Sequence, residues 1–105
     1  MEQQNENIPQ MQSDFETIRL MDDQRKEYWS ARQLCTALGY SAYYKFQRVV
    51  DKAIELAKQK GMNVDDHFSL SVEMVQLGSG AFRKVENLHL SRMACFIVAF
   101  ICFHA

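Results

Sequence analysis

The pattern of hydrophobic and polar positions predicts two pairs of strands and three helices behind a polar start. Residues 1–14 are polar and are expected to form a flexible tail. Residues 15–21 alternate imperfectly between apolar and polar side chains, and 26–29 follow a turn-like stretch, which together predict a β-hairpin. Residues 73–77 and 83–90 are joined by a glycine-containing turn and predict a second hairpin.

Between the two hairpins, apolar positions follow helical spacing. Ser30 and Gln33 form a capping box, so a short helix is expected over residues 31–38, ended by a glycine. Ser41 is expected to cap a longer helix over residues 42–60. At 100° per residue the longer helix has an apolar stripe, made of Phe46, Val50, Ala53 and Ala57.

The last predicted helix is almost entirely apolar. Every residue from Met93 to Phe103 is apolar, and Ser91 precedes this run as a helix cap. The eleven residues of the run are too few to span a bilayer, so a buried helix is expected. Trp29 is expected to anchor the core where the first hairpin meets the first helix. These elements predict one α+β domain over residues 15–105: hairpin, short helix–turn–long helix, second hairpin and C-terminal apolar helix.

Composition excludes several classes of protein. The 105 residues are 48% hydrophobic and 24% charged, which is typical of one globular domain. The net charge of −1 favours no class of partner. Three cysteines are too few for a disulfide scaffold, and the acidic, polar start does not resemble a secretory signal. We therefore expect a cytoplasmic protein with reduced thiols and no membrane association.

No arrangement of residues supports catalysis or a cofactor. Asp65, Asp66 and His67 carry acid–base groups, but neighbours in a connecting loop rarely converge on one point. Turn and capping roles are expected for them, and a small hydrolase using Asp66 and His67 is the enzyme alternative. The cysteines and histidines lack zinc-ligand spacing, and the Gly78–Gly80 turn lacks the context of a phosphate loop. We predict a non-enzymatic protein without metal or cofactor.

Basic residues are concentrated in the middle of the chain. Residues 32–60 carry two acids and six bases, whereas residues 1–31 carry seven acids and three bases. On the predicted long helix, Lys45, Arg48 and Lys52 share one face, away from the apolar stripe. This face is either an anion-binding surface or an ordinary solvated helix face.

Five short blocks of sequence resemble one bacterial protein family. The blocks are Trp29-Ser-Ala-Arg-Gln-Leu, Leu38-Gly-Tyr-Ser-Ala-Tyr, Asp65-Asp-His-Phe, Gly78-Ser-Gly-Ala and Leu90-Ser-Arg-Met-Ala-Cys. Their order and approximate spacing, over roughly residues 15–97, are similar to the DNA-damage-inducible protein D family, whose opening part resembles the BRO N-terminal domain of phage antirepressors. That family continues after the position of Cys95 into further helices, so we expect a truncated member, a member with a frameshifted end, or a small stand-alone member.

The resemblance implies a BRO-N-like fold and a DNA-associated, non-enzymatic role in the bacterial DNA-damage (SOS) response. Together with the charge pattern, it predicts weak to moderate contact with the phosphates of single- or double-stranded DNA through the helical pair 31–52. First-turn amides of the capped helix are expected to add donors. The residues expected to take part are Arg32, Tyr43, Tyr44, Lys45, Arg48 and Lys52, with Arg83 and Lys84 near the tip of the second hairpin.

The alternative is a protein-interaction module that acts without direct DNA contact. A pI near 6.3 favours this interpretation over strong DNA binding. The partners would be recombination or repair proteins, or the targets of an antirepressor-like regulator. Phe96, Phe100 and Phe103 of the apolar helix would form the contact surface, and the same helix predicts a homo-oligomer.

Overall fold

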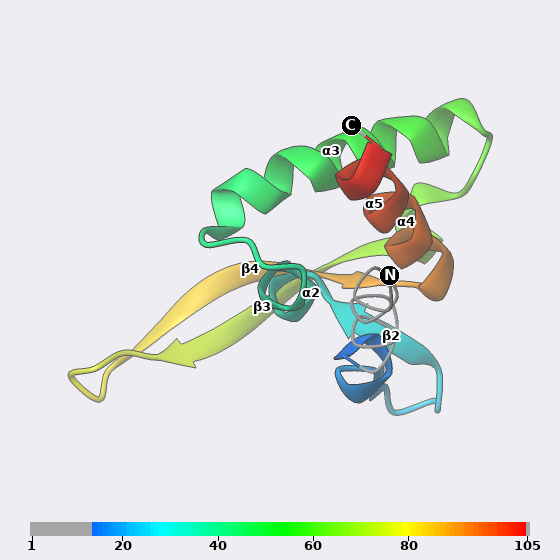
Figure 1. Ribbon diagram of the computed structural model, residues 1–105. Coiled ribbons are helices and arrows are strands. Elements are labelled where there is room, and N and C mark those ends of the chain that lie inside the picture. Colours follow the sequence, from blue (N-terminus) through cyan, green and yellow to red (C-terminus); the bar gives the residue numbers. More distant parts are fainter. Residues whose placement is uncertain (1–13, 105) are drawn as a thin grey trace.

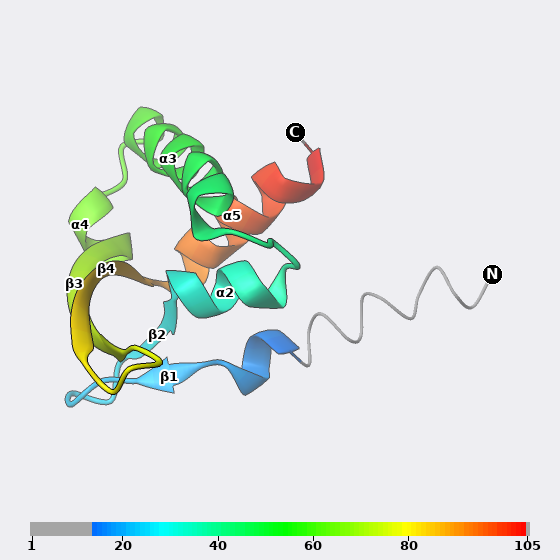
Figure 2. The same ribbon diagram turned by 90° about the vertical axis from the view of Figure 1, so that its left-hand side faces the viewer.

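The fold is a twisted four-stranded antiparallel sheet with helices packed along one side (Figures 1 and 2). The computed structural model describes residues 14–104, so nearly all of the expected tail at 1–14 lies outside the described residues. The strand order is β1-β2-β4-β3. The strands are β1 (Leu20–Met21), β2 (Glu27–Ser30), β3 (Phe68–Gln76) and β4 (Phe82–Leu90). The predicted α+β class is confirmed.

The first hairpin is much shorter than predicted. Residues 14–17 are helical rather than extended, and only the two residues of β1 pair with β2. The turn is closed by the Asp22 carboxylate, which accepts hydrogen bonds from the amides two and four residues later, at 2.8 and 2.9 Å. The helical turn lets the Phe15 ring stack on Trp29, with 4.4 Å between ring centroids. This contact explains why the alternation before β1 does not become a strand.

Helices α2 (Ala31–Ala37) and α3 (Tyr43–Gln59) match their predicted positions closely. The hydroxyl oxygen of Ser30 accepts the amide of Gln33 at 3.2 Å, which confirms the N-terminal cap of α2. The predicted cap of α3 is wrong, because Ala42 occupies the N-cap position and no side chain bonds there. The predicted apolar stripe is confirmed, since all four side chains are fully buried: Phe46, Val50, Ala53 and Ala57.

The second hairpin is longer than predicted and projects from the domain. Helix α4 (Val64–His67) leads directly into β3, and β3 and β4 pair without a break from Phe68↔Leu90 to Gln76↔Phe82. Phe68 and Leu90 are buried at the base. Beyond them the ribbon extends away from the helices (Figure 1). We call residues 70–88 the hairpin arm.

Helix α5 (Arg92–His104) packs against α3 but is covered on one face only. The hydroxyl oxygen of Ser91 accepts the amide of Ala94 at 3.0 Å, which confirms the predicted cap. Ala94, Cys95 and Val98 are buried, whereas four large apolar side chains are 50–57% exposed: Met93, Phe96, Phe100 and Phe103. The expectation of a buried helix is therefore wrong for this second face. Within residues 14–104, no helix has the length and apolar character needed to cross a membrane.

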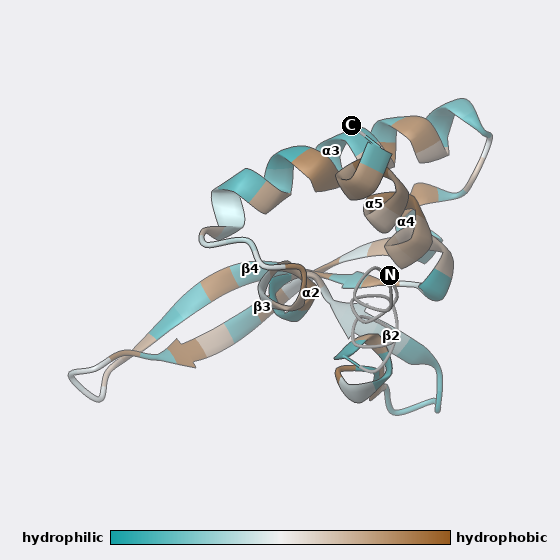
Figure 3. Cartoon of the chain, in the orientation of Figure 1, coloured by the Kyte–Doolittle hydropathy of each residue, from teal (hydrophilic) through white to brown (hydrophobic). Residues whose placement is uncertain are grey.

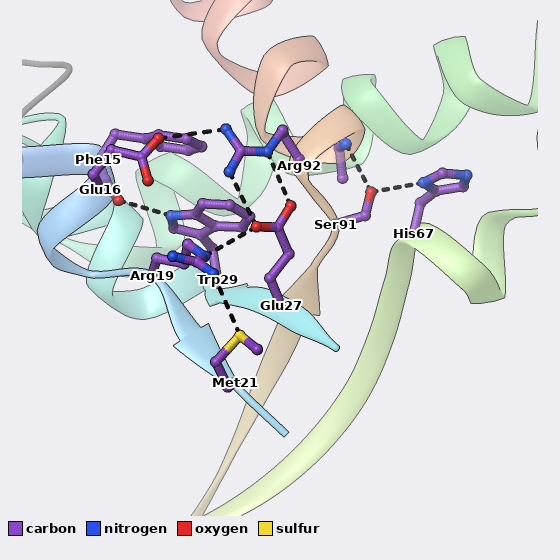
Figure 4. Close-up of polar contacts among 10 residues, drawn as sticks. Phe15, Glu16, Arg19, Met21, Glu27, Trp29, His67, Ser91 and Arg92 are labelled. Carbon is purple, nitrogen blue, oxygen red and sulfur yellow. Dashed lines mark hydrogen bonds and ion pairs between the residues drawn. The ribbon is translucent and has the colours of Figure 1, made fainter. Parts of the chain in front are cut away.

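Charged side chains surround the fully buried Trp29, which confirms its predicted role as a core anchor (Figure 4). The indole N–H donates to the carbonyl of Phe15 at 2.9 Å. The Arg92 guanidinium lies 5.1 Å from the Trp29 ring centroid and donates twice to Glu27, at 2.9 and 3.0 Å. It also contacts Glu16 at 3.4 Å. This cluster joins residues 14–17, β2 and α5.

Candidate nucleic-acid interface

The predicted basic face of α3 is present on the molecular surface. Lys45, Arg48 and Lys52 are all exposed, and none has an ion pair with another described residue. They extend over about 10 Å of helix at 1.5 Å per residue. The fully buried apolar stripe of α3 fixes their direction, because it turns the opposite side of the helix outward. We call these three residues the basic stripe.

Acidic residues on α3 flank the basic stripe, but each has another partner. The carboxylate of Asp51 accepts a hydrogen bond from the Gln47 amide at 3.0 Å. Glu55 lies 4.0 Å from the ammonium group of Lys58, in an exposed pair. Neither carboxylate pairs with a residue of the basic stripe, but their two negative charges lower the net positive charge of this side of α3.

Arg32 and Tyr43 are close together but are used inside the domain. The Arg32 guanidinium lies 4.1 Å from the Tyr43 ring centroid, and its Nε donates to the carbonyl of Glu86 at 2.9 Å. Tyr43 is half-buried, and this burial is the main reason why its pKa is raised. One face of the Tyr43 ring is therefore occupied, and Arg32 joins α2 to β4 and α3.

Two of the first-turn amides of α2 are already used inside the domain. In α2 the amide of Arg32 donates to the side chain of Asn87 at 3.2 Å, and that of Gln33 donates to Ser30. The prediction that first-turn amides of this helix bind phosphate is therefore wrong for these two groups. Helix α3 begins without a side-chain cap. Its first turn also carries Tyr44, which is 65% exposed, and Lys45.

Arg83 and Lys84 lie on the hairpin arm, apart from the basic stripe. Both are exposed, and they pair across the ladder with Val75 and Met74 near the tip. Neighbouring residues of a strand point to opposite faces of the sheet, so Arg83 and Lys84 lie on different faces of the arm. The tip lies well away from α3 in both views (Figures 1 and 2). The structure thus separates the predicted cations into two groups.

An apolar surface on the hairpin arm was missed by the sequence reasoning. Leu70, Val72 and Met74 are 58–67% exposed, and Phe82, which shares their face through the cross-strand register, is 60% exposed. The signal was present as the alternation Leu-Ser-Val-Glu-Met over 70–74. Alternation predicts the strand and its two faces, but not that the apolar face stays uncovered. Figure 3 shows apolar segments on the arm and along α5.

Residues with potential for acid–base or metal chemistry do not converge. Asp65 and Asp66 are exposed in the first turn of α4, where Asn63 supplies the cap. The His67 ring Nδ1 lies 2.6 Å from the Ser91 hydroxyl, which joins α4 to the start of α5. Burial raises the pKa of Cys95 to about 12. Among residues 14–104, no three His, Cys, Asp or Glu side chains are grouped as metal ligands would be.

Comparison with known proteins confirms the resemblance found in the sequence. DNA damage-inducible protein D of Escherichia coli (strain K12) is 44% identical to this chain over 84 residues. The match covers 80% of this chain but 31% of that protein, so the chain spans about a third of its relative's length. No protein-family model and no solved structure matches the chain. Over the matched part, the chain belongs to the family of DNA damage-inducible protein D.

Proposed function

We propose that this domain is a non-enzymatic DNA-associated module of the bacterial DNA-damage response, and that it contacts phosphates through the basic stripe. The observation that carries the proposal is the set of three exposed, unpaired cations on one face of a rigid helix. The name of the E. coli relative supports the biological context. The three free cysteines fit a cytoplasmic location, where thiols stay reduced.

The geometry favours recognition of the phosphate backbone over reading of base edges. Lysine and arginine side chains on one face bind phosphate oxygens without sequence information. Tyr44 and Lys45 also lie in the first turn of α3, which has no side-chain cap, although the amide of Lys45 itself donates to the carbonyl of Ala42. The open ring of Tyr44 offers a surface on which a base or sugar can pack. The role of Arg32 and Tyr43 is to hold the start of α3 against α2 and β4.

The test is a fluorescence anisotropy titration with labelled single- and double-stranded DNA at about 50 and about 200 mM salt. Each phosphate contact contributes about −0.7 to −0.9 to the log–log salt slope, so the basic stripe predicts a slope of about −2 to −3. A slope of about −4 or steeper would indicate that the cations of the hairpin arm also contact phosphates. No binding at the lower salt would contradict the proposal.

A pair of double variants tests the position of the contact. Lys45→Glu with Arg48→Glu is expected to abolish binding while the far-ultraviolet circular dichroism spectrum stays unchanged. Lys26→Glu with Lys60→Glu changes the net charge equally, at two exposed positions off the stripe. We expect this control to bind within about threefold of the parent. Equal losses in both double variants would show an effect of overall charge and contradict the assigned face.

Interaction with repair proteins is the second candidate function, and the exposed apolar face of the hairpin arm favours it. Patches of several hundred Å² of apolar surface mark contact sites on many proteins. The DNA titration separates the two candidates. Absence of DNA binding would leave the protein-interaction role as the better-supported function.

A further inference from the structure

The large exposed side chains of α5 are spaced along the helix at intervals that are the same in either direction of the chain. Met93, Phe96, Phe100 and Phe103 follow one another at intervals of three, four and three residues. At 100° per residue they lie within about 80° of one another, on the side opposite the buried Ala94, Cys95 and Val98. We call these four residues the α5 stripe.

We propose that the α5 stripe is the interface of a homodimer, in which the α5 helices of two copies pack antiparallel about a twofold axis. The palindromic spacing brings Phe96 opposite the partner's Phe100, and Met93 opposite the partner's Phe103. Both pairs of side chains form in the same alignment of the two helices, because the twofold axis passes midway between Phe96 and Phe100. Spacing of three and four residues is also the spacing with which helices interdigitate at shallow crossing angles.

The chemistry of the α5 stripe favours a second copy over a charged partner. A twofold interface places each patch against itself, so like charges would repel across it. No charged residue lies between Arg92 and His104, and Arg92 is turned toward Glu27 and Glu16. The stripe is thus self-complementary. A partner recognised through charge would find nothing to pair with along this helix.

The area of the α5 stripe is small for a specific interface and predicts a weak dimer. A half-exposed aromatic side chain leaves on the order of 100 Å² uncovered. Pairing two stripes therefore buries about 800 Å², against about 1,200 Å² for a typical small specific interface. Phe96 also borders an apolar cavity of about 470 Å³ beside the stripe, lined in part by Leu34 and Leu38, which adds surface for the partner. We therefore expect a weak dimer that forms only as the protein concentration rises.

The dimer leaves the basic stripe uncovered. Helices α3 and α5 pack their buried sides against each other, and α5 also packs on β2 and β4. The basic stripe and the α5 stripe point away from this shared core. Dimerisation and DNA contact are therefore separable in experiments. Failure of one does not imply failure of the other.

The test is sedimentation velocity of the 105-residue chain between about 1 and 200 µM. The parent is expected to shift from the mass of one chain toward that of two. Phe100→Asp is expected to remain monomeric throughout this range, because it places a charge against the partner's Phe96. Leu70→Asp is the matched control, since Leu70 is 67% exposed on the hairpin arm and off the stripe. It should dimerise as the parent does.

A charge-pair experiment tests the register independently of any loss of folding. Phe96→Lys alone and Phe100→Asp alone should each be monomeric. Their mixture should form a heterodimer, because the ammonium group introduced in one variant faces the carboxylate introduced in the other. A parent that stays monomeric at about 200 µM would overturn the proposal. So would a dimer that Leu70→Asp disrupts and Phe100→Asp does not, because that result would place the interface on the hairpin arm.

Discussion

At the scale of single residues, Arg92 does the most to join distant parts of the chain. Its guanidinium contacts Glu27 on β2 and Glu16 in the first helical turn, and it lies over the ring of Trp29. Glu27 accepts a second cation, Arg19, at 3.0 Å. The hydrogen bond from Arg92 is the main cause of the lowered pKa of Glu27, and the charges of both arginines act in the same direction.

Arg92→Gln is expected to weaken the pH dependence of stability. A carboxyl group with a lowered pKa stabilises the folded state above its ordinary pKa of 4.5 and loses this contribution as the pH falls below it. The parent should therefore lose more of its thermal midpoint between pH 6 and pH 3 than the variant does. Thermal unfolding followed by circular dichroism at these two pH values measures the difference.

Arg48→Gln is the matched control for that measurement. Arg48 is exposed on α3 and has no ion pair among the described residues, so its loss should leave the acid dependence as in the parent. If Arg92→Gln and the parent showed the same acid sensitivity, the cluster around Glu27 would not be a source of acid-labile stability.

At the scale of elements, one of the two serines that precede helices α2 and α3 caps its helix, and the other does not. The Ser30 hydroxyl accepts the Gln33 amide and also a hydrogen bond from Asn87 at 2.8 Å, so it joins α2 to β4. Ser41 precedes α3 but caps nothing, because the helix begins one residue later than its position would allow. The two serines look alike in the sequence and differ only in the structure.

Ser30→Ala should therefore destabilise the domain, and Ser41→Ala should not. Loss of an N-cap costs about 1 kcal/mol. Leaving the buried Asn87 amide without one of its partners adds to this cost, so we expect a loss of about 1–3 kcal/mol. Ser41→Ala should change the free energy of unfolding by less than about 0.5 kcal/mol. Urea denaturation measures both, and equal effects would mean that the cap at Ser30 contributes nothing of its own.

The parts of the fold that could be predicted from the sequence are those that depend on neighbouring residues. The apolar stripe of α3 was predictable because helical periodicity is local, and burial of one face places the basic stripe on the other. The N-cap at Ser30 and the turn at 78–81 were local too. The Arg92–Glu27 pair joins residues 65 positions apart, and no local pattern marks it. The first helical turn was missed because the contact of Phe15 with Trp29 overrides a weak alternation.

At the scale of the whole molecule, the core is at one end and the hairpin arm at the other. The buried residues come from α2, α3, α5 and the base of the sheet, and the arm contributes only Asn87 to them. The sequence could predict that this hairpin exists. It could not predict that the arm projects, because projection depends on where the helices end rather than on the strands themselves.

Backbone amides of the arm should therefore exchange with solvent sooner than those of the core. Local opening costs little where few apolar contacts are lost, so amides that pair between residues 72–76 and 82–86 should lose protection before those in 46–57 of α3. Hydrogen exchange followed by mass spectrometry or NMR measures the order. Equal protection of the arm and α3 would show that the arm is covered in solution.

The tip of the hairpin arm offers a place to attach a probe. A side chain added at Gly78 would meet no other atom within 4 Å, and the same is true at Gly80, although its φ of +91° favours glycine. Residues 77–81 contribute nothing to the core. A fluorescent dye or a short affinity tag inserted at Gly78 would thus report on the orientation of the domain on a bound molecule, while both the basic stripe and the α5 stripe stay unmodified.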